Sequence, residues 1–511
     1  MASSYLDISR STQLRKRKEK FLYRFLEMVP AILSWGTLIL AIAFSWLLPA
    51  AVAIFIIVFD FFWLIRVIYL AVHQLAGYKK MKENMKKNWV LELENLPGRN
   101  WQDIYHLIIL PMYKEGIEIA EPTIKSLLDS NYPKDKMIVI LALEESGKDV
   151  SLPISRELGE KYGKEFLEMA STLHPKGVSG ELAGKGSNVA YALKESKKII
   201  DRLNIPYENI IVSNFDVDTK PYPEYFGILA WSFLTNSDPL KSSYQPIPIY
   251  NNNIWQVPAF SRVIATSNTF WQMMQQERPE QLVSYSSHAI PFKALMEVGY
   301  PDNIVSDDSR IFWKSYLFYD GDYKMVPLYY PVSMDAVLAD SLWKTAFNQY
   351  RQQRRWAWGC VEIPYLLFNF LKNKKISCWK KIRHAYVILD GFWSWATSAL
   401  IIFFLGWLPL MLGNMEFKTS MLSYNLPKVT SYIMTLAMVG MFVSAGLSLL
   451  TLPPKPKRYG KLKSLSMVLQ WFLLPITLIL FGTFPSLDAQ LRLFLGKHLG
   501  FWVTEKYRKK E

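Results

Sequence analysis

Two long apolar runs follow each other near the start of the chain. Residues 29–49 contain no charged side chain, and residues 50–72 form a second run that includes Asp60 and Arg66. About twenty apolar residues in a helix are enough to cross the hydrocarbon core of a bilayer. The pattern therefore predicts two transmembrane helices. The two ionisable residues are candidates for the wall of a conduit, although Arg66 could equally reach the membrane interface.

Apolar runs return after about residue 384, over residues 384–412, 429–452 and 465–484. They predict about three further transmembrane segments. Pro475 in the last run leaves open a kinked or re-entrant element. The side of the membrane that holds the C-terminus is also open, because a fifth full span would place it outside. The basic residues near the end instead argue for the inside, namely Lys506, Arg508, Lys509 and Lys510.

The middle of the chain is more polar and alternates between two patterns. Short apolar runs at residues 105–110, 137–143 and 210–213 are typical of buried strands. Helical patterns lie between them, over residues 119–128, 151–169 and 185–200. Strands that alternate with helices predict an α/β domain with a mostly parallel sheet and right-handed crossovers.

These patterns divide the chain into five predicted parts. They are a basic cytosolic N-terminus (1–28), two transmembrane helices (29–72), a cytosolic α/β domain with interfacial helices (73–380), about three transmembrane segments (381–486) and an amphipathic, basic C-terminal tail (487–511).

The charge of the chain fits a membrane protein with basic cytoplasmic parts. The formal net charge is +15 and the isoelectric point is near 9.3. A nucleic-acid partner is not expected, because no nucleic-acid-binding motif accompanies the charge. The two cysteines, Cys360 and Cys378, form neither a metal-ligand set nor a disulfide framework. We therefore expect a multi-pass protein of the inner or plasma membrane with its α/β domain in the cytoplasm.

Two carboxylates follow the predicted strand at residues 210–213. Asp216 and Asp218 are separated by one residue, and hard oxygen ligands at this spacing can share a divalent cation with substrate phosphates. Glu144 and Glu145 follow the strand at 137–143, and Tyr113 follows the strand at 105–110. Ligands bind beyond the carboxyl ends of parallel strands, so these residues predict a nucleotide pocket. A solvated acidic turn is the alternative reading of Asp216 and Asp218.

Two polar motifs lie further along the chain. The first is Ser306–Arg310, which contains Asp307 and Asp308. The second is Gln352–Trp356, in which two arginines precede a tryptophan. A guanidinium group offers forked donors to a diphosphate, and an indole ring packs on a sugar. An anchor at the membrane interface is the alternative for the second motif.

Together these motifs resemble the processive, membrane-embedded family 2 glycosyltransferases, the group of cellulose, chitin and hyaluronan synthases. Their hallmark series is a P-x-Y-N-E-like strand end, an acidic residue after the second strand, a G-K loop, D-x-D, a T-E-D-like motif and Q-x-x-R-W. Here the series reads, in order, as residues 111–115, 144–145, 184–186, 216–218, 306–308 and 352–356.

The resemblance implies an inverting GT-A domain that uses Mg²⁺ or Mn²⁺ and a nucleotide-sugar donor. The implied metal ligands are Asp216 and Asp218, and the implied general base is Asp308, with Asp307 as the alternative. The implied nucleotide-binding residues are Tyr113, Glu115, Lys185, Asp216 and one of Glu144 or Glu145. The residues implied to contact the leaving diphosphate and the acceptor are Gln352, Arg354, Arg355 and Trp356. His288 either contacts the acceptor or is a buried structural histidine.

Three departures from the family pattern affect these expectations. Lys114 replaces the usual Asn. Glu replaces the usual Asp after the second strand, which leaves the recognition of uracil open. Asp307 stands where Glu is usual, which keeps it as an alternative base.

The leading hypothesis is a glycosyltransferase that moves a sugar, expected to come from a UDP-sugar, onto a growing polysaccharide that crosses the membrane. The first alternative is a non-processive enzyme that glycosylates a membrane lipid. The second is an inactive partner or a transport subunit. The expected partners are the donor, a polysaccharide or lipid-linked acceptor and membrane lipids, and the need for an accessory subunit is open.

Overall fold

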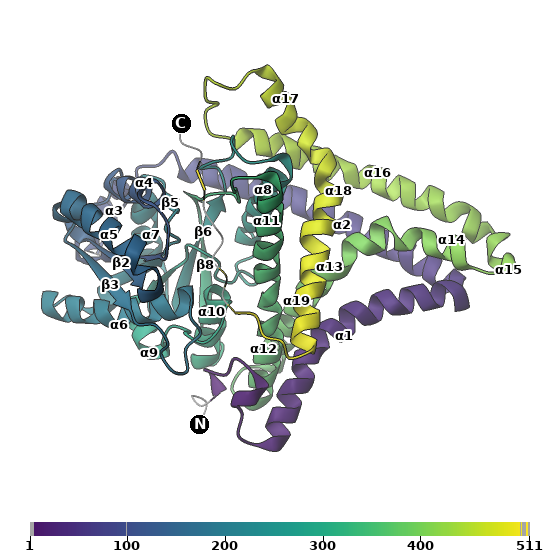
Figure 1. Ribbon diagram of the computed structural model, residues 1–511, viewed down its shortest axis with the longest axis horizontal. Coiled ribbons are helices and arrows are strands. Elements are labelled where there is room, and N and C mark those ends of the chain that lie inside the picture. Colours follow the sequence, from purple (N-terminus) through teal and green to yellow (C-terminus); the bar gives the residue numbers. More distant parts are fainter. Residues whose placement is uncertain (1–4, 99, 501, 503–506, 509–511) are drawn as a thin grey trace.

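The computed structural model describes residues 5–98, 100–500, 502 and 507–508. An α/β domain occupies one side of the molecule, and long helices extend from it on the other (Figure 1). The α/β domain corresponds to the polar middle of the sequence, and the long helices correspond to its apolar runs.

The α/β domain contains an eight-stranded sheet in the order β3-β2-β1-β4-β7-β6-β8-β5. The strands β1 to β4 run parallel, β7 is antiparallel to both β4 and β6, and β6 pairs with β8 in parallel. The bounds are β1 (Tyr105–Met112), β2 (Met137–Glu144), β3 (Glu168–His174), β4 (Ile210–Asn214), β5 (Lys220–Pro221), β6 (Ser242–Ile249), β7 (Ala289–Pro291) and β8 (Lys324–Ser333).

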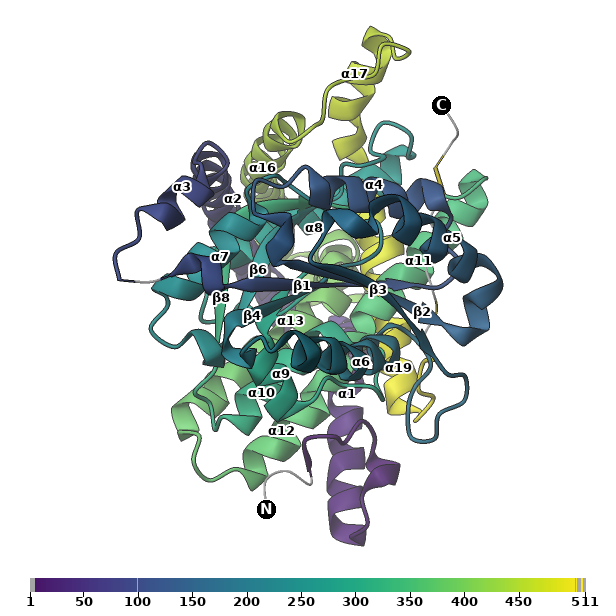
Figure 2. The same cartoon turned by 90° about the vertical axis from the view of Figure 1, so that its left-hand side faces the viewer.

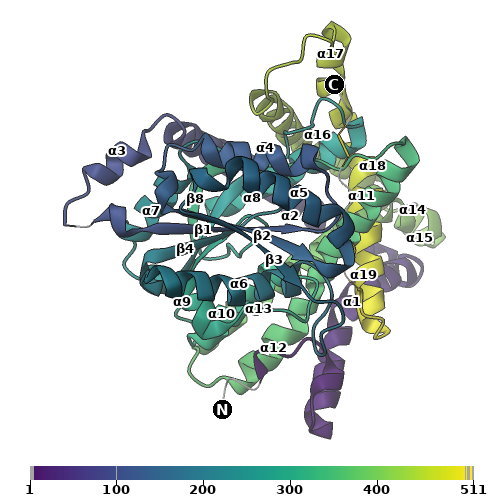
Figure 3. The same cartoon turned by 60° about the vertical axis from the view of Figure 1, so that its left-hand side comes forward.

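Helices cover both faces of this sheet (Figures 2 and 3). Successive side chains of a strand point to opposite faces, and β1 follows this rule. Its residues Ile108 and Leu110 pack with helices α4 (Ile117–Leu128), α5 (Lys148–Tyr162) and α7 (Tyr225–Thr235). Its residues Leu107 and Ile109 pack with α6 (Lys185–Leu203) and α9 (Phe292–Val298). The predicted fold class is confirmed, namely a GT-A-like, mostly parallel α/β domain beside an α-helical region of membrane-spanning character.

Two predictions of local structure were wrong. The helix predicted over residues 151–169 ends at Tyr162, and residues 168–174 form β3 at the sheet edge. The edge strand is half exposed, so it lacks the continuous apolar run of a buried strand. The predicted strand at residues 105–110 continues through Pro111 to Met112. The remaining helices of this domain are α3 (Trp89–Glu94), α8 (Ala259–Gln276), α10 (Asp307–Phe318), α11 (Leu342–Ala357) and α12 (Glu362–Lys372).

Five helical segments among the described residues are long and apolar enough to cross a membrane. Four of them are single helices: α1 (Arg17–Leu47), α2 (Pro49–Asn84), α13 (Cys378–Phe403) and α16 (Met421–Leu450). The two short helices α14 (Leu408–Leu412) and α15 (Met415–Lys418) connect α13 with α16 at the end farthest from the sheet (Figure 1).

The fifth segment, Lys461–Phe494, differs from the other four. It comprises α17 (Lys461–Leu469), α18 (Leu474–Thr477), a π-helical turn over Leu478–Thr483 and α19 (Phe484–Phe494). In Figure 1 its latter part, α18 and α19, runs across the direction of α16, beside the α/β domain. Pro475 stands in the first turn of α18, where the helix changes its winding.

Both ends of the described chain contact the α/β side of the molecule. Near the N-terminus, the carbonyl oxygens of Leu6 and Ile8 accept hydrogen bonds from Tyr365 and Arg310. The first residues of the predicted amphipathic tail, 487–494, lie in α19 (Phe484–Phe494), which buries one of its faces. This helix is tied to α1, because Arg24 donates to the carbonyl oxygen of Leu493 at 2.9 Å.

Candidate active site

The carboxyl ends of β1, β2 and β4 open into one cavity of about 1730 Å³. Eleven of the fourteen candidate catalytic and binding residues line this cavity: Tyr113, Glu115, Glu144, Lys185, Asp216, Asp218, Asp307, Asp308, Gln352, Arg355 and Trp356. They come from parts of the chain more than 200 residues apart, so the fold, rather than local sequence, brings them together.

The two aspartates after β4 stand in different surroundings. One oxygen of Asp216 lies 2.9 Å from Nζ of Lys185, and the other accepts a hydrogen bond from Ser286 at 2.7 Å. Asp218 is buried, and its Oδ2 accepts a hydrogen bond from the backbone N–H of Asp335 at 3.2 Å. These contacts fix the side chains of Asp216 and Asp218. Both residues still border the cavity.

The oxygen ligands of these two residues fit a divalent cation such as Mg²⁺ or Mn²⁺. The described residues contain no group of three or more His, Cys, Asp or Glu side chains that could hold a metal ion. Mg²⁺ characteristically binds through one or two carboxylates together with substrate phosphates and water. Asp216 and Asp218 would thus hold the cation only together with a phosphorylated ligand.

Lys185 is the first residue of α6 and lies at the centre of the acidic cluster. Its Nζ contacts Asp216 and also lies 3.0 Å from Oδ1 of Asp308. Burial opposes the charge of this ammonium group, but the carboxylates of Asp216, Asp308 and Asp307 outweigh burial and raise its pKa. Lys185 therefore remains a cation between the metal-ligand candidates and the base candidate.

The neighbouring residue Gly186 allows α6 to approach α10 closely. A Cβ atom at this position would lie 2.8 Å from the carbonyl oxygen of Pro301 and 3.0 Å from Cβ of Asp307. Only glycine fits such an approach without a shift of the neighbours. The G-K loop and the base motif are thus packed directly against each other.

Asp307 and Asp308 begin α10 and differ in environment. Asp307 is buried and accepts a hydrogen bond from the hydroxyl of Tyr300 at 3.0 Å. Burial, followed by the charge of Asp308, raises the pKa of Asp307 to about 7. Asp308 is the more open of the two and directly contacts Lys185. This geometry supports Asp308 as the base, with Asp307 behind it.

His288 lies behind Asp308 and is not among the residues that line the cavity. Its Nδ1 lies 2.8 Å from the carbonyl oxygen of Tyr285 and 3.7 Å from Oδ1 of Asp308. Burial lowers the pKa of His288. Its position fits a buried histidine that supports Asp308 better than a direct contact with the acceptor.

At the ends of β1 and β2, Tyr113 and Glu144 border the cavity while Glu145 does not. Glu145 accepts a hydrogen bond from the backbone N–H of Lys176 instead, at 2.9 Å. Burial raises the pKa of Glu144. Glu115 accepts a hydrogen bond from the backbone N–H of Tyr113 at 2.7 Å, which fixes the strand end. Of the two glutamates after β2, the structure brings Glu144 to the cavity.

The residues of the Gln352–Trp356 motif on α11 likewise point in different directions. Gln352, Arg355 and Trp356 line the cavity. Arg354 points elsewhere, and its guanidinium forms an ion pair with Asp488 of α19 at 2.8 Å. Successive residues of a helix point in different directions, so one of the two arginines is drawn to a second helix.

Several residues at the cavity were missed from the sequence. Tyr507 lines it, and Arg508 forms an ion pair at 2.8 Å with Asp335, the residue that contacts Asp218. No local pattern connects residue 508 with residue 335. Of the other basic residues near the end, Lys506, Lys509 and Lys510 lie outside the described residues. One face of α8 was also missed, although its polar residues recur with a helical period.

Comparisons with known proteins give a likeness to solved structures alone. No family model matches the chain, and no curated protein matches it. A mannosyltransferase from Pyrobaculum calidifontis in complex with GDP-Man and Mn²⁺ is 14% identical, covers 84% of this chain and 99% of its own, and has a TM-score of 0.40.

Two further structures are similar at a lower level. TarS from S. aureus (residues 1–349) in complex with UDP-GlcNAc is 12% identical over 67% of this chain and 90% of its own, with a TM-score of 0.36. Glucosyl-3-phosphoglycerate synthase from Mycobacterium tuberculosis with Mg²⁺ and UDP is 13% identical over 55% of this chain and 86% of its own, with a TM-score of 0.30. Likeness at this level carries no argument about activity, so the function has to be argued from the site itself.

Proposed function

We propose that this chain is an inverting family 2 glycosyltransferase that moves a sugar from a nucleotide-sugar, expected to be a UDP-sugar, onto a growing polysaccharide. The observation that carries the proposal is the continuity of one cavity. It contains Asp216, Asp308 and Trp356 at one end, and at the other it is lined by residues of α2, α13 and α16. One cavity could thus hold both the site of sugar transfer and a path between the apolar helices.

The arrangement of charges suits displacement at an anomeric carbon. The acceptor hydroxyl attacks this carbon, its proton passes to Asp308, and the bond to the nucleoside diphosphate breaks. Lys185 and Arg355 stand where they can compensate the negative charge that develops on the diphosphate. A bound Mg²⁺ or Mn²⁺ would add Lewis-acid stabilisation of the same leaving group. Direct attack without a covalent intermediate inverts the configuration.

The cavity also supports passage of the product between the membrane helices. Asp60, Arg66 and Asp390 line its distant part. Arg66 forms an ion pair with Asp390 and donates a hydrogen bond to Ser394 at 2.7 Å. Ionisable groups within apolar helices are costly unless they are paired or face water, and they commonly mark a transport path.

We further propose that α1, α2, α13 and α16 cross the membrane, while Lys461–Phe494 lies along the boundary between membrane and α/β domain. An even number of crossings places both chain ends on the side of the α/β domain. The contacts of Ile8 with Arg310 and of Arg508 with Asp335 support this arrangement. The basic loop 453–463 supports a cytoplasmic position for that side in a cell-membrane protein.

A membrane-lipid acceptor is the second candidate, because the same cavity reaches apolar helices that could admit a lipid-linked sugar. The two candidates differ in their products. A polymerising enzyme yields a high-molecular-weight polysaccharide, whereas the alternative yields a short product that is extracted with lipid.

The test is nucleoside-diphosphate release by the purified, detergent-solubilised protein with Mn²⁺, across a panel of UDP-sugars that also includes GDP-mannose. Products are sized on a gel and extracted with organic solvent. We expect release with one donor, loss of release after chelation with EDTA, and loss in Asp218→Asn and Asp308→Asn. Protein that is folded and binds UDP but releases nothing from any donor would contradict the enzyme proposal and favour an inactive or transport subunit.

A further inference from the structure

One face of α8 is polar although the helix is packed inside the protein. Counted from Ser267, the other residues of this face lie one, four, five and eight positions further along the chain, which keeps them on a single helix face. The polar residues Ser267, Asn268, Gln272 and Gln275 line the cavity together with Trp271, and the neighbouring apolar residues Ile264, Phe270 and Met274 border it as well. A helix that served only to fill the interior would present apolar side chains here.

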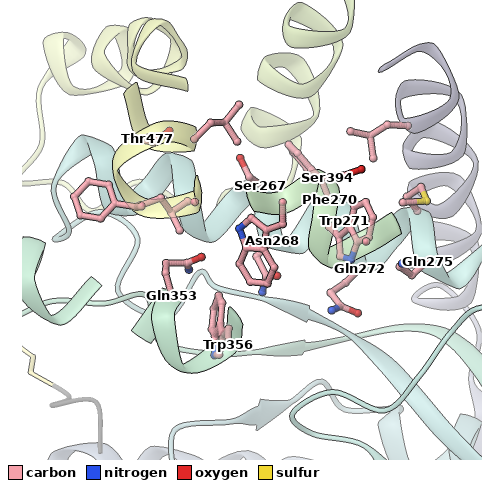
Figure 4. A pocket seen from close by; sticks show the side chains of 18 of the residues that line it. Ser267, Asn268, Phe270, Trp271, Gln272, Gln275, Gln353, Trp356, Ser394 and Thr477 are labelled. Atoms are coloured by element: carbon pink, nitrogen blue, oxygen red, sulfur yellow. The ribbon is translucent and has the colours of Figure 1, made fainter. Parts of the chain in front are cut away.

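Three amide groups at this face are buried without a hydrogen-bond partner among the described residues. They are Oε1 of Gln272, Oε1 of Gln275 and, across the cavity on α11, Nε2 of Gln353. The three residues are only 2%, 9% and 5% exposed. Leaving a buried polar group unsatisfied destabilises a protein, so such groups are normally bonded to a ligand or to water. Figure 4 shows these amides around the same space.

The amide face is connected to Trp356, the residue expected to stack on the acceptor sugar. Asn268 donates a hydrogen bond at 2.8 Å to the hydroxyl of Tyr250. The ring of Tyr250 in turn lies 6.3 Å, between centroids, from that of Trp356. The indole of Trp271 also borders the cavity (Figure 4). Aromatic rings beside amide donors and acceptors match the apolar faces and the hydroxyl groups of a sugar.

The charges near this face indicate which sugars it accepts. Arg278, one turn beyond Gln275, contacts Glu280 at 3.4 Å, and Arg66 is paired with Asp390. Asp60 adds a carboxyl group whose Oδ1 has no hydrogen-bond partner among the described residues. The two arginines that could bind a carboxylated sugar at this face thus already have acidic partners. Such a sugar would also lie near the carboxyl group of Asp60.

We propose that the polar face of α8 is a second acceptor subsite, which binds an uncharged sugar residue of the growing chain behind the one on Trp356. The inference rests on the proposed function and extends it to the chemical class of the product, a neutral polysaccharide. Gln272 and Gln275 bind hydroxyl or acetamido groups of that sugar, while Asn268 holds Tyr250 beside Trp356.

Binding of neutral oligosaccharides to the full-length protein in detergent tests the subsite directly. The probes are cellohexaose and chitohexaose, measured by calorimetry in the presence of UDP and Mn²⁺. We expect one of them to bind the wild type, and the double variant Gln272→Leu/Gln275→Leu to bind it at least tenfold more weakly. The control is Gln102→Leu, a glutamine on the exposed surface, which should match the wild type.

UDP affinity in the same experiment reports whether each variant is folded. If the double leucine variant fails to bind UDP, Gln272→Glu replaces it, because this change keeps the size of the side chain and adds a negative charge. We expect Gln272→Glu to weaken hexaose binding as well. In the polymerisation assay, either variant should shorten the product several-fold.

Three results would overturn the subsite. They are hexaose binding that is unchanged in folded variants, binding of neither hexaose by the wild type, or equally tight binding of an oligosaccharide that contains uronic acid. None of these results depends on catalysis. Failure of the proposed function appears separately, as an absence of nucleoside-diphosphate release from every donor by protein that still binds UDP.

Discussion

The ammonium group of Lys185 lies 3.0 Å from a carboxylate oxygen of Asp308. The same group contacts Asp216, so one buried cation joins the proposed base to the proposed metal ligands. A nucleoside diphosphate bound at Asp216 and an acceptor hydroxyl at Asp308 would therefore meet on the two sides of Lys185. We therefore expect Lys185 to act in the proposed reaction, beyond the nucleotide contact that the family resemblance implies.

Replacement of Lys185 by glutamine should lower turnover by about 10²–10³-fold, in line with the loss of one group that stabilises transition-state charge. Lys185→Arg should retain part of the activity because it keeps the positive charge. Nucleoside-diphosphate release measures the effect, and Lys194→Gln, an exposed lysine of the same helix, serves as the control. Activity of Lys185→Gln within tenfold of the wild type would contradict this role.

Asp307 should make the stability of the protein depend on pH. Its pKa is raised to about 7 in the folded chain, against an ordinary value of 3.8. Between these values the folded protein holds a proton that the unfolded chain has lost, so the free energy of unfolding falls as pH rises from about 4 to about 7.

The variant Asp307→Asn removes this titration and can still accept the hydrogen bond from Tyr300. Thermal unfolding in detergent between pH 4 and pH 8 should therefore show the wild type losing stability relative to the variant as pH rises. Parallel melting curves for the two proteins across this range would show that Asp307 ionises normally.

Gly147 should be required for nucleotide binding. A Cβ atom at this position would overlap the carbonyl oxygen of Tyr113. Gly147→Ala should thus displace the end of β1 and weaken UDP binding about tenfold, as measured by calorimetry with Mn²⁺. Gly159→Ala on the following helix is the control, since nothing lies within 4 Å of a Cβ atom there. The control should bind UDP normally and gain up to about 1 kcal/mol of stability.

Arg354 and Arg355 should have separable effects although they are adjacent. Arg355→Gln removes a cation from the cavity and should lower turnover about 100-fold or more. Arg354→Gln breaks the ion pair with Asp488 and should mainly lower the melting temperature. Asp488→Asn should lower the melting temperature at least as much as Arg354→Gln, because it also breaks the ion pair with Arg492, and the double variant should be no less stable than Asp488→Asn. Equal losses of turnover in both arginine variants would refute this division.

The segment Lys461–Phe494 should leave both of its ends on the cytoplasmic side. Single cysteines at Lys418, Lys457 and Lys497, all exposed, are introduced after Cys360 and Cys378 have been replaced by serine. An impermeant thiol reagent added to spheroplasts should label the cysteine at position 418 alone, and permeabilised cells should label all three. Labelling of position 497 from outside would show that the segment crosses the membrane.

Local sequence predicted secondary structure well where an apolar pattern is repeated along one strand or helix. The apolar runs of β1, β2 and β4 predicted the buried centre of the sheet, because both faces of these strands are covered. The half-exposed edge strand β3 lacks such a run. The strands β6 and β8 contain prolines and were not predicted, since proline is a poor strand signal.

For the site, the amino-acid sequence alone determined which residue types follow each strand, and thereby the candidates Asp216 and Asp218, whereas Asp308 became a candidate through the family resemblance. It could not decide the direction of each side chain. Arg354 turns to Asp488, Glu145 turns to the backbone of Lys176, and His288 is buried behind Asp308. Each of these contacts joins residues that are distant in the chain.

Only the tertiary structure decided that the polar face of α8 borders the same cavity as Trp356, and that Arg508 reaches Asp335. The physical reason is that apolar periodicity specifies which face of an element is buried, whereas the rotation and neighbours of that element depend on packing throughout the molecule. The candidate chemistry of the site could thus be predicted from the sequence, whereas the proposed acceptor side depends on how the helices pack together.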